Sequence, residues 1–182
     1  MLAAIDVGNT NILVGLHSGN QWVHHWRVQT DPNKMPDEYH LLFTGLLSEA
    51  GRSGADLSRC IVSSVVPELT GTISGTFRRI SGTTPLIAGV DLNSPVAVRS
   101  ENPREVGADL LANAVAAFTR YRGRCIIVDF GTALTFTAVS DTGEFLGAAI
   151  APGLRTAASA LSRSTAQLPH IELVAPPKAV GT

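Results

Sequence analysis

Cysteine is scarce in this sequence, which has two, Cys60 and Cys125, among 182 residues. They form no C-x-x-C pair, and no histidine stands near them at a spacing typical of metal ligands. Neither a disulfide framework nor a zinc site is therefore indicated. Each thiol comes just ahead of an apolar run rich in β-branched residues. We expect both to be reduced thiols buried in strands of a cytoplasmic protein.

An excess of charge of one sign and long apolar runs are also missing. The net charge of −1 provides no clustered basic face, which binding to nucleic acid would need. No apolar run reaches the length of a membrane span, about 18 residues. Residues 1–6 have no basic start and reach a carboxylate too early for a signal peptide. We expect neither nucleic acid nor a membrane as a partner, which leaves small molecules or a second copy of the chain.

What the sequence does contain is the composition of a globular protein, with 45% hydrophobic and 16% charged residues. Its length allows one domain or two small ones. Apolar runs between turn signals predict an antiparallel meander of three short strands, at 2–8, 11–17 and 21–28. Helices that begin at Pro36 and Pro67 then alternate with strands at 60–65 and 86–88. This alternation predicts an α/β fold whose sheet is partly parallel.

The second half of the chain begins with a strong helix signal and then repeats the meander. Asn102, Pro103 and Glu105 fit the N-cap, first and third positions of a helix expected to run to about residue 120. Strands are predicted at 125–130, 133–139 and 144–150, with a turn at 141–143 between the last two, and a helix at 154–163.

A short motif is repeated at the end of the first strand of each meander. Asp6-Val7-Gly8-Asn9-Thr10 closes one strand, and Asp129-Phe130-Gly131-Thr132-Ala133 closes another, 123 residues later. Glycine reaches positive φ and lacks a Cβ, so such a turn is sharp and lets a phosphate approach the backbone. The two carboxylates would bind a cation, directly or through its water. One such turn is common in ordinary hairpins, but two in the same setting favour a nucleotide phosphate site.

Two meanders, each with a phosphate turn and followed by helices and strands, are the plan of the actin-like ATPase and sugar-kinase fold. In that α/β fold, two ribonuclease H-like lobes face each other across a nucleotide cleft. We expect residues 1–118 to form the first lobe and residues 119–182 to begin the second. Little after residue 160 supplies the remaining strands and helices, so the second lobe is expected to be incomplete in this chain.

Four stretches resemble the type III pantothenate kinases, and the likeness runs over essentially the whole chain. They are Ala4-Ile5-Asp6-Val7-Gly8-Asn9-Thr10, Asn102-Pro103-Arg104-Glu105-Val106-Gly107-Ala108-Asp109, Val128-Asp129-Phe130-Gly131-Thr132-Ala133 and Gly147-Ala148-Ala149-Ile150-Ala151-Pro152-Gly153. The resemblance implies transfer of the γ-phosphoryl group of ATP to the primary hydroxyl of pantothenate, the first step of coenzyme A synthesis. It also implies Mg²⁺ with ATP, a monovalent cation (K⁺ or NH₄⁺), and a cytoplasmic homodimer.

The resemblance further implies roles for individual residues. Asp109 matches the catalytic base, which accepts the proton of the attacking hydroxyl, and Asp129 matches the site of the monovalent cation. From the residues alone, Asp109 is also explained as an acidic side chain favoured near a helix N-terminus. The residues expected to line the ATP phosphates are Asp6, Val7, Gly8, Asn9, Thr10, Asn11, Ile12, Leu13 and Thr132. Those expected around pantothenate are Ser100, Gly107, Ala108, Asp109 and Leu110.

The chain departs from the family's pattern at several positions. Leu110 stands where an arginine usually binds the substrate carboxylate, and leucine has no charged donors to replace it. Ser100 stands where tyrosine is expected beside pantothenate, and Thr137 where an aspartate often follows the second turn. The final Val-Gly-Thr resembles the start of a substrate-contacting motif that would extend past residue 182. Two alternatives follow: a catalytically weak nucleotide-binding relative that acts as a regulatory accessory factor, and a kinase for another small alcohol.

Overall fold

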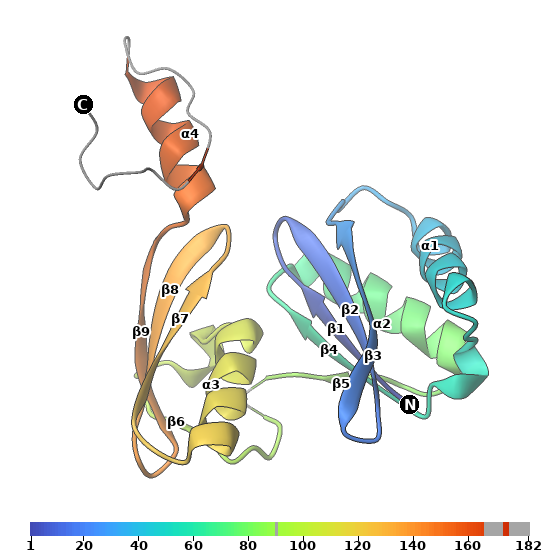
Figure 1. The fold of residues 1–182 in the computed structure, drawn as a ribbon, viewed down its shortest axis with the longest axis horizontal. Helices are drawn as coiled ribbons and strands as arrows, with labels where there is room; N and C mark the ends of the chain where they lie inside the picture. The colour runs from blue at the N-terminus through green and yellow to red at the C-terminus, as the bar shows by residue number, and fades with distance from the viewer. Residues whose placement is uncertain (90, 166–172, 175–182) are drawn as a thin grey trace.

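Two β-sheets organise the part of the chain that the computed structural model describes, which is residues 1–89, 91–165, 173 and 174. Figure 1 shows them as two separate groups of strands, with helix α3 (Ala108–Tyr121) on the side of the second sheet that faces the first. The predicted α/β class and the presence of two sheet-based lobes are confirmed. The final Val-Gly-Thr of the sequence lies outside the described residues.

The first sheet has five strands in the order β3-β2-β1-β4-β5. They are β1 (Leu2–Val7), β2 (Asn11–Ser18), β3 (Gln21–Gln29), β4 (Arg59–Ser64) and β5 (Leu86–Ile87). The first three pair antiparallel, while β4 and β5 are added in parallel. Parallel neighbours need crossover connections, which α1 (Pro36–Glu49), the short η1 (Gly54–Asp56) and α2 (Pro67–Ser81) supply. Both the meander and the parallel part agree with the prediction from sequence.

Alternation along β1 decides which face of the first sheet is buried. Ala3, Ile5 and Val7 point to one face and are at most 2% exposed. That face packs against the apolar sides of α1 and α2, which contribute Phe43 and Phe77 to the same core. The ring centroids of these two phenylalanines are 5.0 Å apart. The core therefore fixes the first sheet and places the end of β1, with Asp6, at one edge of the lobe.

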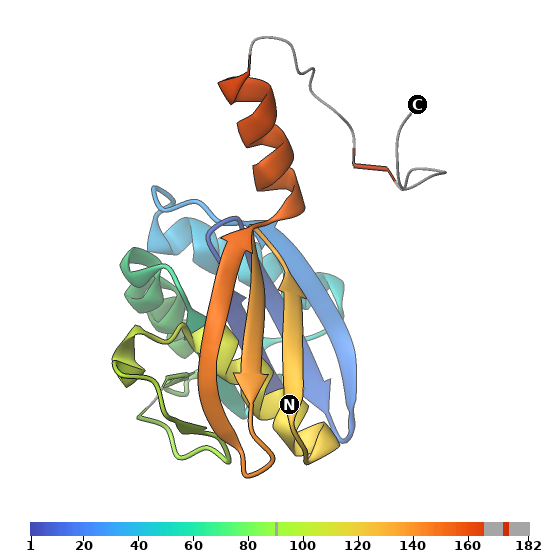
Figure 2. The same cartoon turned by 90° about the vertical axis from the view of Figure 1, so that its left-hand side faces the viewer.

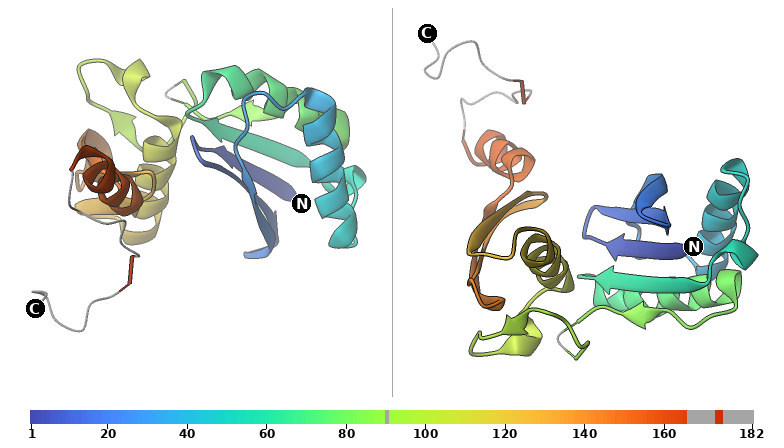
Figure 3. Two further views of the ribbon diagram at one scale, coloured as in Figure 1. Left: turned by 90° about the horizontal axis from the view of Figure 1, so that it is seen from above. Right: turned by 60° about the horizontal axis from the view of Figure 1, so that its bottom comes forward.

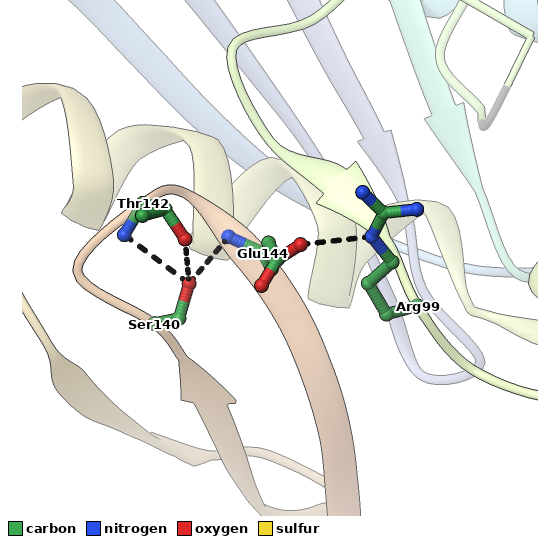
Figure 4. A network of polar contacts seen from close by, with 4 residues as sticks. All are labelled: Arg99, Ser140, Thr142 and Glu144. Carbon is green, nitrogen blue, oxygen red and sulfur yellow. Dashed lines mark hydrogen bonds and ion pairs between the residues drawn. The ribbon is translucent and has the colours of Figure 1, made fainter.

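The second sheet repeats the meander in the order β6-β9-β8-β7. Its strands are β6 (Ala97–Val98), β7 (Cys125–Phe130), β8 (Ala133–Val139) and β9 (Glu144–Pro152), and α4 (Leu154–Ser164) follows. The β8–β9 turn is closed by Ser140 Oγ, which accepts the backbone N–H of Glu144 at 2.9 Å. The Glu144 carboxylate in turn pairs with Arg99 Nε at 2.9 Å, just after β6 (Figure 4). These contacts attach the two-residue strand β6, which the sequence did not predict.

The helix expected to start at Asn102 begins six residues later. Residues Pro103–Glu105 form a separate 3₁₀ turn, η2, and the Asn102 side chain makes no capping hydrogen bond. Val106 is extended and Gly107 is the N-cap of α3, so the helical signals at 102–105 serve only one short turn. The prediction of one continuous helix was therefore wrong.

Helix α3 lies between the two sheets (Figure 3). Leu110, Leu111, Ala114 and Phe118 on one side of it pack with Val139 and Phe145 in a second core. The helix also contacts β4 of the first sheet. Because α3 touches both sheets, the division into residues 1–118 and 119–182 stays a prediction.

The outer face of the second sheet is apolar and open. Ile126, Val128 and Phe130 are 64%, 44% and 69% exposed, whereas their counterparts in the repeat, Ala3 and Ile5 among them, are buried. Figure 2 looks onto this face, and no described element lies over it. Among the described residues, no strand pairs with the free edge of β7, where β4 pairs with β1 in the first sheet. The described part of the second lobe therefore repeats only the meander.

Two expectations drawn from composition also have an outcome. Cys60 in β4 and Cys125 in β7 are free thiols within strands, as predicted; Cys60 is buried, whereas Cys125 is only partly buried, less than expected. Within the described ranges, no helix has both the length and the apolar character needed to cross a bilayer.

Candidate functional site

The two repeated turns, one from each sheet, meet. The turn between β1 and β2 carries Thr10, and the turn between β7 and β8 carries Thr132. Their hydroxyl oxygens are 2.8 Å apart and form a hydrogen bond that joins segments 122 positions apart in the sequence. Asn9, Thr10 and Thr132 are exposed. The two motifs thus lie on opposite sides of one site.

The glycines of these turns do not have the conformation expected from the sequence. Neither Gly8 nor Gly131 has positive φ, so that part of the expectation was wrong. Space is tight at Gly8, because a Cβ there would lie 3.2 Å from the Asn11 carbonyl oxygen, whereas at Gly131 the nearest atom would be 3.4 Å away. The glycine N–H groups close the turns, from Gly8 to Asn11 O at 3.0 Å and from Gly131 to Ala133 O at 2.9 Å. Asn9, Thr10 and Thr132 donate their backbone N–H groups to no acceptor in the described part of the chain.

Three carboxylates gather beside the turns. Burial raises the pKa of Asp6, the Ser63 hydroxyl lowers that pKa, and the nearby charges of Asp109 and Asp129 raise it further. Ser63 is the register partner of Asp6 in the β1–β4 pair. Its hydroxyl oxygen is buried without a hydrogen bond of normal distance and angle to any described residue. The carboxylates of Asp6, Asp109 and Asp129 are therefore close enough to interact electrostatically.

Asp109 is held at the start of α3 by its immediate neighbours. Its Oδ1 accepts the backbone N–H of Leu110 at 2.8 Å. The same carboxylate oxygen occupies the space where a Cβ on Gly107 would stand, so any larger residue at 107 would displace the Asp109 side chain. Gly107 thus leaves room for the Asp109 carboxylate in its observed position.

Asn113 is a residue of the site that the sequence reasoning missed. Its Nδ2 donates to Asp129 Oδ2 at 2.9 Å and links α3 to the end of β7. Asn113 stands four residues after Asp109, so both side chains lie on one face of α3. That spacing is the signal that could have identified it.

Several residues predicted for the site have buried side chains. Val7 and Ile12 are fully buried in the first core, and Leu110 is 8% exposed in the second. Only the backbone of these three residues is available to a ligand. Ser100 has a buried hydroxyl oxygen without a hydrogen-bond partner among the described residues. Leu13 is exposed, whereas Asn11, Gly107 and Ala108 are partly buried.

A cavity of about 660 Å³ lies beside the segment predicted to bind the acceptor. Asn102, Arg104, Glu105 and Leu111 line it, together with Val96 and Val98. The three clustered carboxylates are not part of its wall. The cavity and the carboxylate cluster are linked along the chain, because η2 and Leu111 line the cavity and Asp109 lies between them.

The protein groups alone do not complete a metal site. Within the described residues, no three side chains of His, Cys, Asp or Glu are placed to hold one ion together. Mg²⁺ commonly uses one or two carboxylates with waters and substrate phosphates. Asp6 and Asp129 fit that kind of partial coordination.

Comparison with known proteins gives a consistent result. A family model described as type III pantothenate kinase matches residues 2–182. A type III pantothenate kinase of Dehalococcoides mccartyi is 46% identical over 181 residues, covering 100% of this chain and 69% of the relative. One of Moorella thermoacetica is 45% identical and covers 100% of this chain and 71% of its own length.

Solved structures agree on the fold. A Baf family protein from Campylobacter jejuni has a TM-score of 0.53 at 15% identity, covering 97% of this chain and 68% of its own. A protein described as a 2-dehydro-3-deoxygalactonokinase from Sinorhizobium meliloti has a TM-score of 0.51 at 15% identity, covering 91% and 58%. At these identities the likeness shows the fold alone.

Proposed function

Since the chain belongs to the type III pantothenate kinase family, we propose that it phosphorylates pantothenate at the site between the two turns and α3. The reaction transfers the γ-phosphoryl group of ATP to the alcohol of pantothenate, the first step of coenzyme A biosynthesis. The observation that carries the assignment to this site is the Thr10–Thr132 hydrogen bond beside Asp6, Asp109 and Asp129. The site thus contains hydrogen-bond donors that suit phosphates, together with carboxylates that can bind a cation or accept a proton.

The phosphates of ATP bind between the turns. Asn9, Thr10 and Thr132 are exposed residues whose backbone N–H groups reach no acceptor among the described residues, and such donors suit phosphate oxygens. The two threonine hydroxyls, which bond to each other in the structure, would turn to the phosphates when ATP binds. Between Asp6 and Leu13, residues with buried side chains, such as Val7 and Ile12, can offer a phosphate only their backbone N–H groups. Phosphoryl transfer depends mainly on such positioning and on neutralising charge.

Asp109 is the base of the reaction. Its carboxylate takes the proton of the attacking hydroxyl as the phosphoryl group is transferred. It stands between the carboxylate cluster and the Ser100–Leu110 side, which is the side we propose for pantothenate. Gly107 and Ala108 border that acceptor site through their backbone, and Ser100 lies beside it with a buried hydroxyl that has no partner in the described part of the chain.

Two cations complete the site. Mg²⁺ would be held by ATP and by Asp6, directly or through water, and when bound it neutralises phosphate charge. A monovalent cation, K⁺ or NH₄⁺, would bind at Asp129, whose Oδ2 is already oriented by Asn113. Replacing K⁺ by the smaller Na⁺ through dialysis should raise the KM for ATP.

The protein would act as a homodimer in the cytoplasm, with no nucleic acid or membrane as partner. The net charge of −1 supports only the expectation of no nucleic acid partner, because it provides no basic excess. Sedimentation equilibrium of the purified protein tests the oligomeric state, because a monomer at micromolar concentration would contradict the dimer.

The test of function is direct. Purified protein incubated with ATP, Mg²⁺, K⁺ and pantothenate should give 4′-phosphopantothenate, detected by mass spectrometry. Absence of product would sink the assignment. Turnover that is retained in Asp109→Asn would instead refute the role of Asp109. A panel of hydroxylated compounds, run in parallel, tests whether another small alcohol is the better acceptor.

A further inference from the structure

The first turn is tied down by a residue with no role in the proposed chemistry. Thr30 is the first residue after β3 and is 8% exposed. Its backbone N–H donates to the carbonyl oxygen of Thr10 at 3.0 Å. Its hydroxyl donates to the carbonyl oxygen of Gly8 at 2.6 Å. Thr30 therefore occupies two carbonyl oxygens of the turn from Asp6 to Thr10.

The second turn is tied down in the same way from the start of α4. Gly153, the first residue after β9, donates its backbone N–H to the Thr132 carbonyl oxygen at 3.0 Å. The hydroxyl of Thr156 donates to the same oxygen at 2.8 Å. Gly153 is buried, and a Cβ there would collide with the backbone of Gly131 and Thr132. The end of β9 and the first turn of α4 thus press directly on this turn.

The two backbone donors occupy equivalent places in the internal repeat, while their acceptors, Thr10 and Thr132, are 122 positions apart. Gly153 stands 123 residues after Thr30, the same separation as that between Asp6 and Asp129. In each lobe, the first residue after the third strand donates its N–H to a carbonyl of the turn between the first and second strands. The contact therefore recurs with the phosphate motif itself, although the residue types at the two positions differ.

A carbonyl oxygen carries partial negative charge and repels a phosphate, whereas free N–H and hydroxyl groups attract it. Three carbonyl oxygens of the turns, those of Gly8, Thr10 and Thr132, accept these hydrogen bonds. The N–H groups of Asn9, Thr10 and Thr132 remain unengaged within the described residues. These hydrogen bonds thus occupy three carbonyl oxygens of the turns, while the three N–H groups stay available where the turns meet.

We propose that Thr30 and Thr156, together with Gly153, are positioning residues for ATP, which hold the carbonyl oxygens of the two turns away from the phosphates. The idea rests on the proposed placement of the phosphates between the turns. None of the three residues contacts the nucleotide; each acts through the turn that it holds. Removing either hydroxyl weakens the binding of ATP and leaves the acceptor site unaffected.

The chain supplies matched variants. Thr30→Val and Thr156→Val remove one hydroxyl with little change of shape, and Thr30→Ser and Thr156→Ser keep the donor. Thr76 is a buried threonine of α2 whose hydroxyl donates to the Thr72 carbonyl at 2.8 Å, so Thr76→Val is the control for Thr30. Thr165, exposed and donating to Leu161 O at 2.8 Å, is the control for Thr156.

The measurement is the Kd of a fluorescent, non-hydrolysable ATP analogue at fixed Mg²⁺, together with the KM for ATP and for pantothenate. Thr30→Val and Thr156→Val should each bind the analogue about threefold to tenfold more weakly, the range expected for one lost hydrogen bond. The serine and control variants should stay within about twofold of the original protein. The KM for pantothenate should not change in any of them.

The outcomes separate this proposal from the proposed function. Unchanged analogue affinity in both valine variants overturns the positioning role even where pantothenate is phosphorylated. An equal loss in Thr76→Val also overturns it, because the effect would then be general destabilisation. Analogue binding without phosphopantothenate refutes the function, while the positioning role is still decided by the Kd values. A protein that binds no analogue refutes both. If Thr30→Val does not fold, the Kd of Thr156→Val, whose residue is exposed, decides whether the positioning role holds.

Discussion

Replacing Asp109 by asparagine removes one negative charge from the carboxylate cluster while keeping the shape of the side chain. The asparagine oxygen can still accept the Leu110 N–H that Asp109 Oδ1 accepts at 2.8 Å. The close approach over Gly107 is also kept, since the two side chains are isosteric. The substitution therefore tests charge and basicity at this position with little disturbance of structure.

The expected magnitude differs for chemistry, stability and nucleotide binding. Loss of a general base lowers kcat by about 10²-fold to 10⁴-fold, which is about 2.7 to 5.4 kcal/mol of activation free energy. Loss of an acidic side chain in the first turn of α3 costs about 0.3–1 kcal/mol of helix stabilisation. Because the charge of Asp109 raises the pKa of Asp6, its removal favours the ionised form of Asp6. The affinity for ATP should therefore be unchanged or slightly higher.

The assay is steady-state kinetics with ATP and pantothenate varied separately, accompanied by thermal unfolding. The signature of a base is a large fall in kcat with no rise in the KM for ATP and a small change in Tm. Asp141→Asn is the control, because Asp141 pairs with Arg124 in the β8–β9 turn, apart from the cluster. A kcat within tenfold of the original protein would refute the reasoning, as would an equal effect in the control.

Three further predictions address the rest of the molecule. Burial and the charges of Asp109 and Asp129 raise the pKa of Asp6. The contribution of Asp6 to folding stability is therefore full below the ordinary carboxyl pKa of about 3.9, and it is lost as pH rises through the pKa that Asp6 has in the folded protein. Asp6→Asn should raise the Tm of nucleotide-free protein in EDTA at pH 7, with a gain that vanishes toward pH 4; a lower Tm at pH 7 contradicts this. Arg104→Ala should raise the KM for pantothenate, about tenfold, more than that for ATP, because Arg104 is the cation on the wall of the adjoining cavity; equal changes would exclude it as the carboxylate partner. Phe145→Ala, at a position 1% exposed, should lower the free energy of unfolding by about 3–5 kcal/mol in urea titration, and a loss below about 1 kcal/mol would mean that the second core does not depend on it.

Local patterns predicted the strands well because their causes are local. Alternation at Ala3, Ile5 and Val7 decides which face of β1 is buried, and the same alternation in β7 predicts a strand whether or not that face is covered. The prediction of a helix start at Asn102 was wrong for a reason that lies in the residues after the capping signal. Val106 is extended and Gly107 (φ −56°, ψ 139°) is not helical, so the signals at 102–105 end in a separate 3₁₀ turn before α3 begins. A pattern of capping residues has no information on where the residues that follow leave helical conformation.

The two turns were recognisable because they repeat residue types, whereas the contacts that hold them repeat only geometry. Thr30 and Gly153 differ in size, polarity and conformational freedom, yet each donates its backbone N–H to the neighbouring turn. Any residue except proline supplies a backbone N–H donor, so this contact does not determine which side chain stands at either position. At residue 30 a hydroxyl reaches a second carbonyl oxygen. At residue 153 the backbone of Gly131 and Thr132 leaves no room for a Cβ, and Thr156 supplies the hydroxyl instead. The equal spacing of 123 residues was visible in the sequence, but its meaning depends on hydrogen bonds that only the folded chain defines.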